Sequence, residues 1–194
     1  MYAYLQGKFT FKNPAQVYVD VHGVGYEVNI SLNTYAAIQN LPEGRLYTFL
    51  QVKEDGHTLF GFFDKVEKEI FIQLISVSGI GAATARMMLS HMKPDEVSRA
   101  IVQANVKLLE SIKGIGKKTA ERLVLELRDK VGKVVPDINT TALSGNSLQQ
   151  DALNALIALG ISKQQAESSL LKLNNTQPGI NNLEELIKKA LKSI

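Results

Sequence analysis

Apolar and polar residues alternate with a period of two through much of residues 1–63. Residues 17–21 and 26–30 are rich in valine and aromatic side chains, with two closely spaced glycines between them. Two more apolar runs, residues 46–52 and 58–63, are separated by a short segment that contains an Asp-Gly pair. This pattern predicts about five short strands with little helix, and therefore a small β-barrel of the OB-fold type.

The apolar period becomes helical from residue 64 to residue 131, where apolar residues recur three, four and seven positions apart. Residues 132–147 lose this period and contain Gly, Pro, Asn and Ser, which is typical of a flexible linker. A module of three short helices is expected at residues 148–194. Its helical patterns cover residues 148–159, 163–173 and 183–193. The chain is thus predicted to be an α+β protein of several domains.

A repeat lies inside the helical segment. Shifting the chain by 35 residues aligns positions 74–89 with 109–124, and seven of these sixteen positions are identical. The identical pairs are Leu74/Leu109, Ser76/Ser111, Gly79/Gly114, Ile80/Ile115, Gly81/Gly116, Thr84/Thr119 and Ala85/Ala120. Each copy reads as a helix, then Gly-Ile-Gly, then a second helix.

Gly-Ile-Gly followed by a helix is suited to binding an anion. The glycines permit a tight turn and remove the β-carbons that would hold a ligand away from the backbone. The second helix begins with unpaired N–H groups and the positive end of its dipole. A single copy would be better explained as an ordinary helix–turn–helix connection that needs glycine for its turn. Two copies at fixed spacing, the second followed by Lys117 and Lys118, favour phosphate binding without base readout.

Composition and charge narrow the function further. The chain is 45% hydrophobic, carries a net charge of +3 and has no cysteine. The absence of Cys excludes disulfides and thiolate sites and is compatible with the cytoplasm. No membrane-spanning segment or secretory signal is expected. Residues 64–135 hold thirteen Lys/Arg against nine Asp/Glu, so the basic excess coincides with the repeat.

Several enzyme motifs are incomplete in this sequence. Residues 116–119 lack the first glycine of a P-loop, and Gly79-Ile80-Gly81 does not follow a predicted strand, so neither ATP nor a dinucleotide is expected. The three histidines are scattered, and no catalytic set is apparent. We therefore expect no catalytic residues, no metal and no cofactor.

The order of parts resembles the RuvA family over essentially the whole chain. The residues that carry the resemblance are Gly23-Val24-Gly25-Tyr26-Glu27-Val28, Glu54-Asp55 with Leu59-Phe60-Gly61-Phe62, and Gly114-Ile115-Gly116-Lys117-Lys118-Thr119-Ala120-Glu121-Arg122-Leu123. The resemblance implies an OB-fold barrel at 1–63, a tandem helix-hairpin-helix domain at 64–131, a linker at 132–147 and a UBA-like three-helix module at 148–194.

The resemblance also implies a function and partners. A non-catalytic homotetramer or octamer would bind four-way (Holliday) junction DNA without reading sequence. It would hold the junction open and planar, and recruit a hexameric RuvB-type ATPase for branch migration in recombination and repair. A junction resolvase is a further expected partner. The DNA-binding residues would be Gly79, Ile80, Gly81, Arg86, Gly114, Ile115, Gly116, Lys117, Lys118 and Arg122.

Two other sites follow from the same resemblance. Glu54 and Asp55 occupy the position of an acidic pin, although an Asp-Gly pair alone suits an ordinary hairpin turn. The tail residues that match the family's motor-docking positions are Leu156, Leu159, Ile161 and Leu191, which alone would look like core of the module.

One departure from the family concerns the first hairpin, which the family usually follows with Pro and Lys. Ala82 and Ala83 stand there in this chain. The first hairpin is therefore expected to rely on backbone N–H groups, helped by Arg86, and to contribute less affinity than the second.

Two other functional classes share features with this sequence. A helix-hairpin-helix DNA glycosylase would need a catalytic Asp, for which Asp137 in the expected linker is the candidate, and a second helical lobe. An OB-fold single-strand binder would need exposed aromatic platforms, whereas most Phe and Tyr residues fall at strand positions expected to be core.

Overall fold

The computed structural model describes residues 2–131, 146–176, 180 and 182–193. The chain divides into two compact units, Met1–Pro136 and Asp137–Ile194. Within the part described, the elements follow one another as β1(Tyr4–Asn13), β2(Gln16–Val21), β3(Val24–Ile30), α1(Leu32–Ile38), β4(Glu43–Lys53), β5(Gly56–Phe62), α2(Lys65–Ile75), α3(Ala82–His91), α4(Pro94–Val102), α5(Val106–Glu110), α6(Lys117–Val131), α7(Asn146–Ala158), α8(Lys163–Thr176) and α9(Leu183–Lys192).

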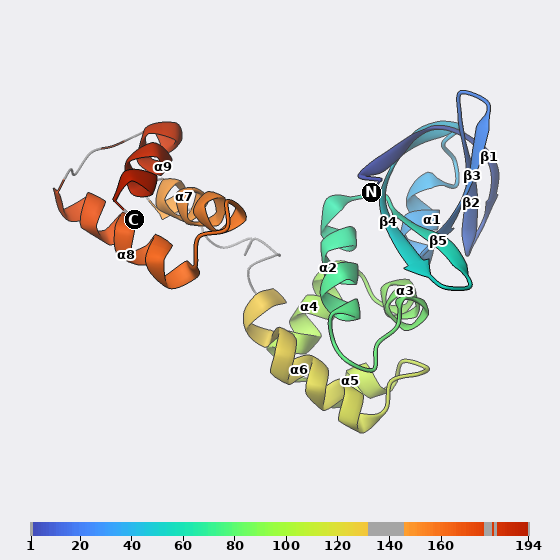
Figure 1. Cartoon of the computed structure of the whole chain (residues 1–194). Coiled ribbons are helices and arrows are strands. Elements are labelled where there is room, and N and C mark those ends of the chain that lie inside the picture. The colour runs from blue at the N-terminus through green and yellow to red at the C-terminus, as the bar shows by residue number, and fades with distance from the viewer. Residues whose placement is uncertain (1, 132–145, 177–179, 181, 194) are drawn as a thin grey trace. The chain divides into compact units, whose positions relative to one another are not determined.

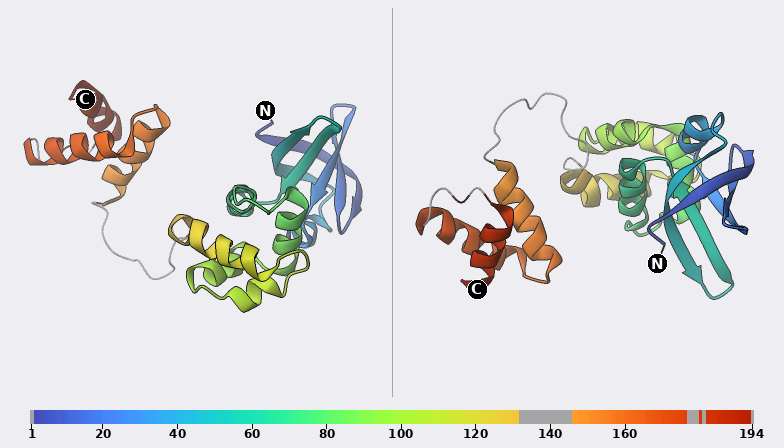
Figure 2. Two further views of the ribbon diagram at one scale, coloured as in Figure 1. Left: turned by 60° about the horizontal axis from the view of Figure 1, so that its bottom comes forward. Right: turned by 90° about the horizontal axis from the view of Figure 1, so that it is seen from above.

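The first unit begins with a closed five-stranded barrel in the order β1-β2-β3-β5-β4 (Figures 1 and 2). All pairs are antiparallel except β3 with β5, which run parallel. Helix α1, which the sequence pattern did not predict, spans the connection from β3 to β4, and Ser31 caps its first turn by accepting a hydrogen bond from Thr34 N. The fold class expected from the sequence, an OB-like barrel with helical parts, is confirmed.

The barrel core is formed by alternate strand residues, as the period of two predicted, together with Ile38 of α1. Leu5, Phe9, Val17, Val19, Val28, Ile30, Ile38 and Leu46 form this core cluster. A bulge in β1 between Phe9 and Phe11 changes the alternation, so that Phe9 is buried while Phe11 is exposed beside Tyr18. Their ring centroids are 4.8 Å apart.

The barrel and the helices of the first unit share a second core. Phe60 and Phe62 of β5 contact Phe71 of α2, with ring centroids 5.2 and 4.8 Å apart, and belong to the cluster that continues through α2, α3, α4 and α6. Strand β5 therefore has apolar side chains in both cores, which attaches the helices firmly to the barrel.

The second unit contains the three helices α7, α8 and α9 around a small core of its own. Helix α7 begins at Asn146, inside the range expected to be linker, and residues 132–145 lie outside the described residues. The proposed domain boundaries therefore stay a prediction. No helix in the described ranges is both long and apolar enough to span a bilayer.

Candidate nucleic-acid interface

The two Gly-Ile-Gly turns have matching backbone conformations. Gly79 and Gly114 adopt φ values of +95° and +94°, a region that is costly for residues with a β-carbon. Ile80 and Ile115 between the glycines are each only 5% exposed, so each turn is anchored in the core by its central side chain. The flanking glycines remain exposed. The turns therefore present backbone, and no side chains of their own, to a ligand.

A helix follows each turn at once. Helix α3 starts at Ala82 after an N-cap at Gly81, and α6 starts at Lys117. The N–H groups of Ala85 and Ala120 donate to the carbonyls of Gly81 and Gly116, as the first bonds of the two helices. Thr119 N also donates to the Gly116 carbonyl, at 3.0 Å. The N–H groups earlier in each first turn have no carbonyl four residues before them inside the helix, so they are suited to a phosphate oxygen.

The two hairpins face each other reciprocally. A β-carbon added to Gly79 would lie 3.9 Å from Thr119 Oγ1, and one added to Gly114 would lie 3.9 Å from Thr84 Oγ1. Each threonine is thus next to the glycine of the other copy, which an approximate twofold axis between the repeats explains. The two turns lie at the same end of the helical region (Figure 1).

The cations are distributed unequally between the two hairpins. Lys117 and Lys118 are exposed in the first turn of α6, whereas Ala82 is buried and Ala83 exposed at the matching positions of α3. Positive side chains at a helix N-terminus oppose the helix dipole. Their presence there is therefore unfavourable for the free helix and favourable once an anion binds.

Arg122 connects the second hairpin to the first. Its Nη1 atom donates to the carbonyl of Ser78 at 3.3 Å, and its Nε lies 3.6 Å from Glu126 Oε1. Arg122 remains exposed. It therefore lies near the first turn as well as on the helix of the second.

Arg86 is placed differently from the other expected DNA-binding residues. Its Nη1 atom donates to the carbonyl of Ala15 at 3.0 Å and to Oδ1 of Asn29 at 2.9 Å, both in the barrel. Burial lowers the pKa of its guanidinium. The sequence offered no signal for this contact, because the partners are more than fifty residues away along the chain.

Glu54 and Asp55 form the two-residue loop between β4 and β5, closed by the pairing of Lys53 with Gly56. All residues from Val52 to His57 are exposed, and the hairpin extends beyond the barrel (Figure 2). Both carboxylates are therefore available to solvent at a protruding tip, with Lys53 beside them.

In the C-terminal module the four residues expected at the docking site fall into two groups. Leu156 is fully buried in the module core, and Ile161 packs against that core. Leu159 and Leu191 are 62% and 42% exposed. Leu171 on α8, which is not one of these four residues, is 64% exposed.

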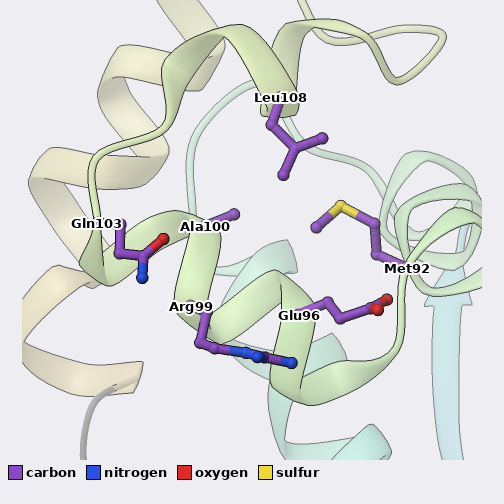
Figure 3. A pocket seen from close by; sticks show the side chains of 6 residues that line it. All are labelled: Met92, Glu96, Arg99, Ala100, Gln103 and Leu108. Atoms are coloured by element: carbon purple, nitrogen blue, oxygen red, sulfur yellow. The ribbon is translucent and has the colours of Figure 1, made fainter.

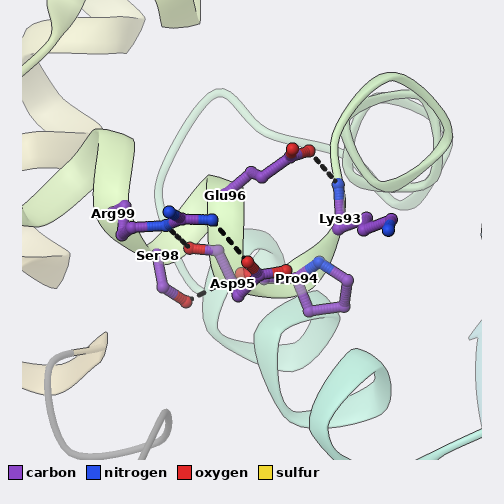
Figure 4. A network of polar contacts seen from close by, with 6 residues as sticks. All are labelled: Lys93, Pro94, Asp95, Glu96, Ser98 and Arg99. Atoms are coloured by element: carbon purple, nitrogen blue, oxygen red, sulfur yellow. Dashed lines mark hydrogen bonds and ion pairs between the residues drawn. The ribbon is translucent and has the colours of Figure 1, made fainter. Parts of the chain in front are cut away.

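A hollow of about 390 Å³ lies beside α4 and was not expected from the sequence. Figure 3 shows Met92 and Leu108 on its apolar side and Glu96, Arg99 and Gln103 on its polar side. Figure 4 shows that the charged residues mainly organise the start of α4: Glu96 Oε2 accepts from Lys93 N at 2.8 Å, and Arg99 pairs with Asp95 at 2.6 Å.

Features needed for the enzyme alternatives are not brought together. Among the described residues, no group of three or more His, Asp or Glu side chains could hold a metal ion. Asp137, the candidate glycosylase residue, lies outside the described residues. A barrel occupies the first unit where a glycosylase would need a second helical lobe.

Three family signatures match the chain in order: RuvA N terminal domain at residues 1–61, SAM-like Helix-hairpin-helix tandem at 71–129, and RuvA, C-terminal domain at 147–194. Curated relatives named Holliday junction branch migration complex subunit RuvA are similar over their full length. The protein of Cytophaga hutchinsonii is 45% identical, with 99% of both chains covered, and that of Christiangramia forsetii is 45% identical, with 100% of both covered. The relative from Flavobacterium psychrophilum is also 45% identical over 100% of both chains. The chain therefore belongs to the RuvA family.

Proposed function

We propose that the protein is the DNA-binding, non-catalytic subunit of a branch-migration complex, and that it recognises four-way junctions in recombination and repair. The observation that carries the proposal is the pair of reciprocal Gly-Ile-Gly turns, each followed by a helix N-terminus. Such turns can bind phosphate groups through backbone N–H groups and carry no means of reading bases. The proposed DNA contacts are made by residues 79–81 and 114–118, with Arg122.

Glu54 and Asp55 are proposed to act at the crossover of the junction. In a tetramer, four such tips would bring eight carboxylates together, where they repel phosphates and disfavour continuous duplex at the centre. The exposure of both side chains at the β4–β5 tip supports this role. The proposed working form is a homotetramer, or two tetramers joined in an octamer.

The C-terminal module is proposed to recruit a hexameric RuvB-type ATPase, which supplies the work of branch migration. The exposed side chains Leu159 and Leu191 would make this contact, while Leu156 and Ile161 support them from the core. We propose that the protein is located in the cytoplasm, and that a junction resolvase is a further partner on the same DNA.

Band-shift titrations on a synthetic four-way junction, a linear duplex and a single strand, at one fixed salt concentration, test the function. The salt must be fixed because phosphate contacts make affinity salt-dependent. Clear preference for the junction is expected. Equal affinity for all three DNA forms would reduce the protein to a general backbone binder.

Variants of the tip test the acidic residues separately. Replacing Glu54 and Asp55 by Gln and Asn keeps the turn and removes both charges. Binding to linear duplex is expected to rise relative to binding to the junction, because the repulsion at the centre is lost. The matched control is Glu43→Gln, an exposed carboxylate at the start of β4, which should leave the ratio unchanged. An unchanged ratio in the tip variant as well would remove the pin from the proposal.

A further inference from the structure

Helix α3 of the first hairpin is tied to the barrel by side-chain hydrogen bonds at two levels. Near its middle, Arg86 donates to the Ala15 carbonyl in the β1–β2 turn and to Asn29 on β3. At its C-terminal end, Asn33 of α1 donates from Nδ2 to the carbonyls of Leu89 and Met92, at 2.5 and 3.0 Å. The two Asn33 bonds satisfy carbonyls that the end of α3 leaves without partners.

The Arg86 contact is built to hold a position. A guanidinium has several donors in a rigid plane, and here one nitrogen reaches two acceptors on different segments of the barrel. The Ala15 carbonyl also accepts from Ile30 N at 3.0 Å, so Arg86 attaches where the β1–β2 turn is already fixed to β3. The side chain is half-buried, unlike the exposed Lys117 and Lys118. Its charge is thus directed at the barrel.

We propose that Arg86 is a positioning residue, which fixes the first Gly-Ile-Gly turn relative to the barrel and so sets the offset between the phosphate-binding turns and the acidic tip. This offset matters only for DNA that meets both features at once. A linear duplex needs the hairpins alone, whereas a junction would contact the hairpins along its arms and the tip at its centre. The DNA consequence rests on the proposed function, but the structural role does not.

Distance measurements test the structural role without DNA. The chain has no cysteine, so spin labels can be attached at His57→Cys near the tip and Ala83→Cys in the first turn of α3, both exposed sites. Arg86→Ala and, separately, Asn29→Ala are expected to broaden the distribution of label-to-label distances, which double electron–electron resonance measures. Arg99→Ala, which removes an exposed arginine from α4, is the matched control and should leave it unchanged. A distribution in Arg86→Ala as narrow as that of the parent would overturn the proposal.

Binding measurements separate positioning from direct phosphate contact. Arg86→Ala is expected to lower the ratio of junction to duplex affinity by about fivefold, within the range for a lost network contact. Duplex affinity and its salt dependence should stay the same. If Arg86 bound phosphate, duplex affinity would fall and the slope against salt would drop by about 1.

Two further variants sharpen this choice. Asn29→Asp places a carboxylate beside Arg86, which keeps the attachment and should preserve the junction preference. A phosphate-binding Arg86 would instead be sequestered, and affinity for all DNA would fall. Arg86→Lys keeps the charge and a single nitrogen with enough donors for both acceptors, so it should retain more of the junction preference than Arg86→Ala does. A parent protein without junction preference would refute the proposed function, while the label distances would still decide the role of Arg86.

Discussion

Ala104 and Gly160 each adopt a left-handed backbone conformation at the end of a helix. Ala104 adopts φ +53° at the end of α4, where Asn105 N donates to the carbonyl of Ala100 at 2.9 Å. Helix α7 ends in the same way, with Ile161 N donating to Leu156 O at 3.1 Å, but there the left-handed residue is Gly160. Glycine is the residue that this helix ending prefers, because it lacks a β-carbon.

Replacing Ala104 by Gly should therefore stabilise the first unit. The relief of the left-handed conformation outweighs the added chain entropy, so the free energy of unfolding should rise by about 0.5–1 kcal/mol. Urea unfolding followed by circular dichroism measures the change. Gly160→Ala is the reciprocal variant and should destabilise the C-terminal module by a similar amount. A loss of stability in Ala104→Gly would mean that chain entropy dominates at this site.

Glu67 is a charged residue in the core between the barrel and the helices. It is 1% exposed, and its carboxylate accepts hydrogen bonds from Ser31 Oγ and, at 2.6 Å, from Thr34 Oγ1. Burial raises the pKa of this carboxyl above its usual value, and the two hydroxyl donors oppose that shift. The nearby Asp64 raises the pKa further, by a smaller amount. Glu67 thus joins α2 to α1 through a buried carboxyl group, at the cost of desolvating that group.

The pH dependence of stability should reveal this cost. Because the folded-state pKa is raised, the contribution of Glu67 is fully present below its unfolded pKa and is lost as the pH rises through the folded pKa. Glu67→Gln should remove that contribution, so its unfolding free energy should fall less than that of the parent between pH 5 and pH 7. Urea titrations at several pH values provide the comparison, and parallel curves for the two proteins would show that Glu67 is charged throughout.

At the scale of elements, the helix-hairpin-helix repeat was predictable because its signal is local. Turn glycines, a buried central Ile and a following helix all lie within sixteen residues, and the structure has them in both copies. The strands were predictable for the same reason. Helix α1 was missed because seven residues are too few to show a helical apolar period, and it is held by contacts such as those of Asn33 with α3. Contacts of this kind join distant segments and leave no pattern in the sequence.

The unequal hairpins make a prediction about α6. Removing both charges with Lys117→Ala and Lys118→Ala should weaken binding to junction and duplex alike, and lower the salt slope by about 1.8 for two lost phosphate contacts. The same change should slightly stabilise the free protein, because it removes cations from a helix N-terminus. Salt-dependent titration and thermal unfolding measure the two effects.

The control for this experiment lies on the same helix. Arg128→Ala with Lys130→Ala removes two exposed cations from the other end of α6. That variant should leave the salt slope nearly unchanged. Equal effects of the two double variants would place the DNA along the whole helix instead of at its N-terminus.

At the scale of the whole molecule, the family resemblance suggests roles for leucines of the C-terminal module whose apolar pattern alone left their roles open. Leu156 is core, as its apolar spacing suggested, whereas Leu159 and Leu191 are exposed leucines that the module does not need for its own packing. From sequence alone the two groups were indistinguishable, since exposure depends on how three helices meet.

Replacing Leu159 and Leu191 by Ser should therefore separate motor docking from DNA binding. Junction affinity and stability should stay within about 0.5 kcal/mol of the parent, as is usual for surface positions. Branch migration with the partner ATPase should be lost. Leu171→Ser is the matched control on α8, and it should support migration normally. If Leu171→Ser failed and the double variant worked, the docking surface would lie on α8.

The approximate twofold axis between the hairpins has a consequence for strand direction. The two strands of a duplex run antiparallel and are themselves related by twofold axes, so a symmetric pair of turns would fit a DNA arm equally well when the arm is reversed. In the first turns of α3 and α6, the charge difference between Lys117-Lys118 and Ala82-Ala83 breaks this equivalence. In each arm of a junction, one strand of defined polarity would then be bound more tightly than its complement.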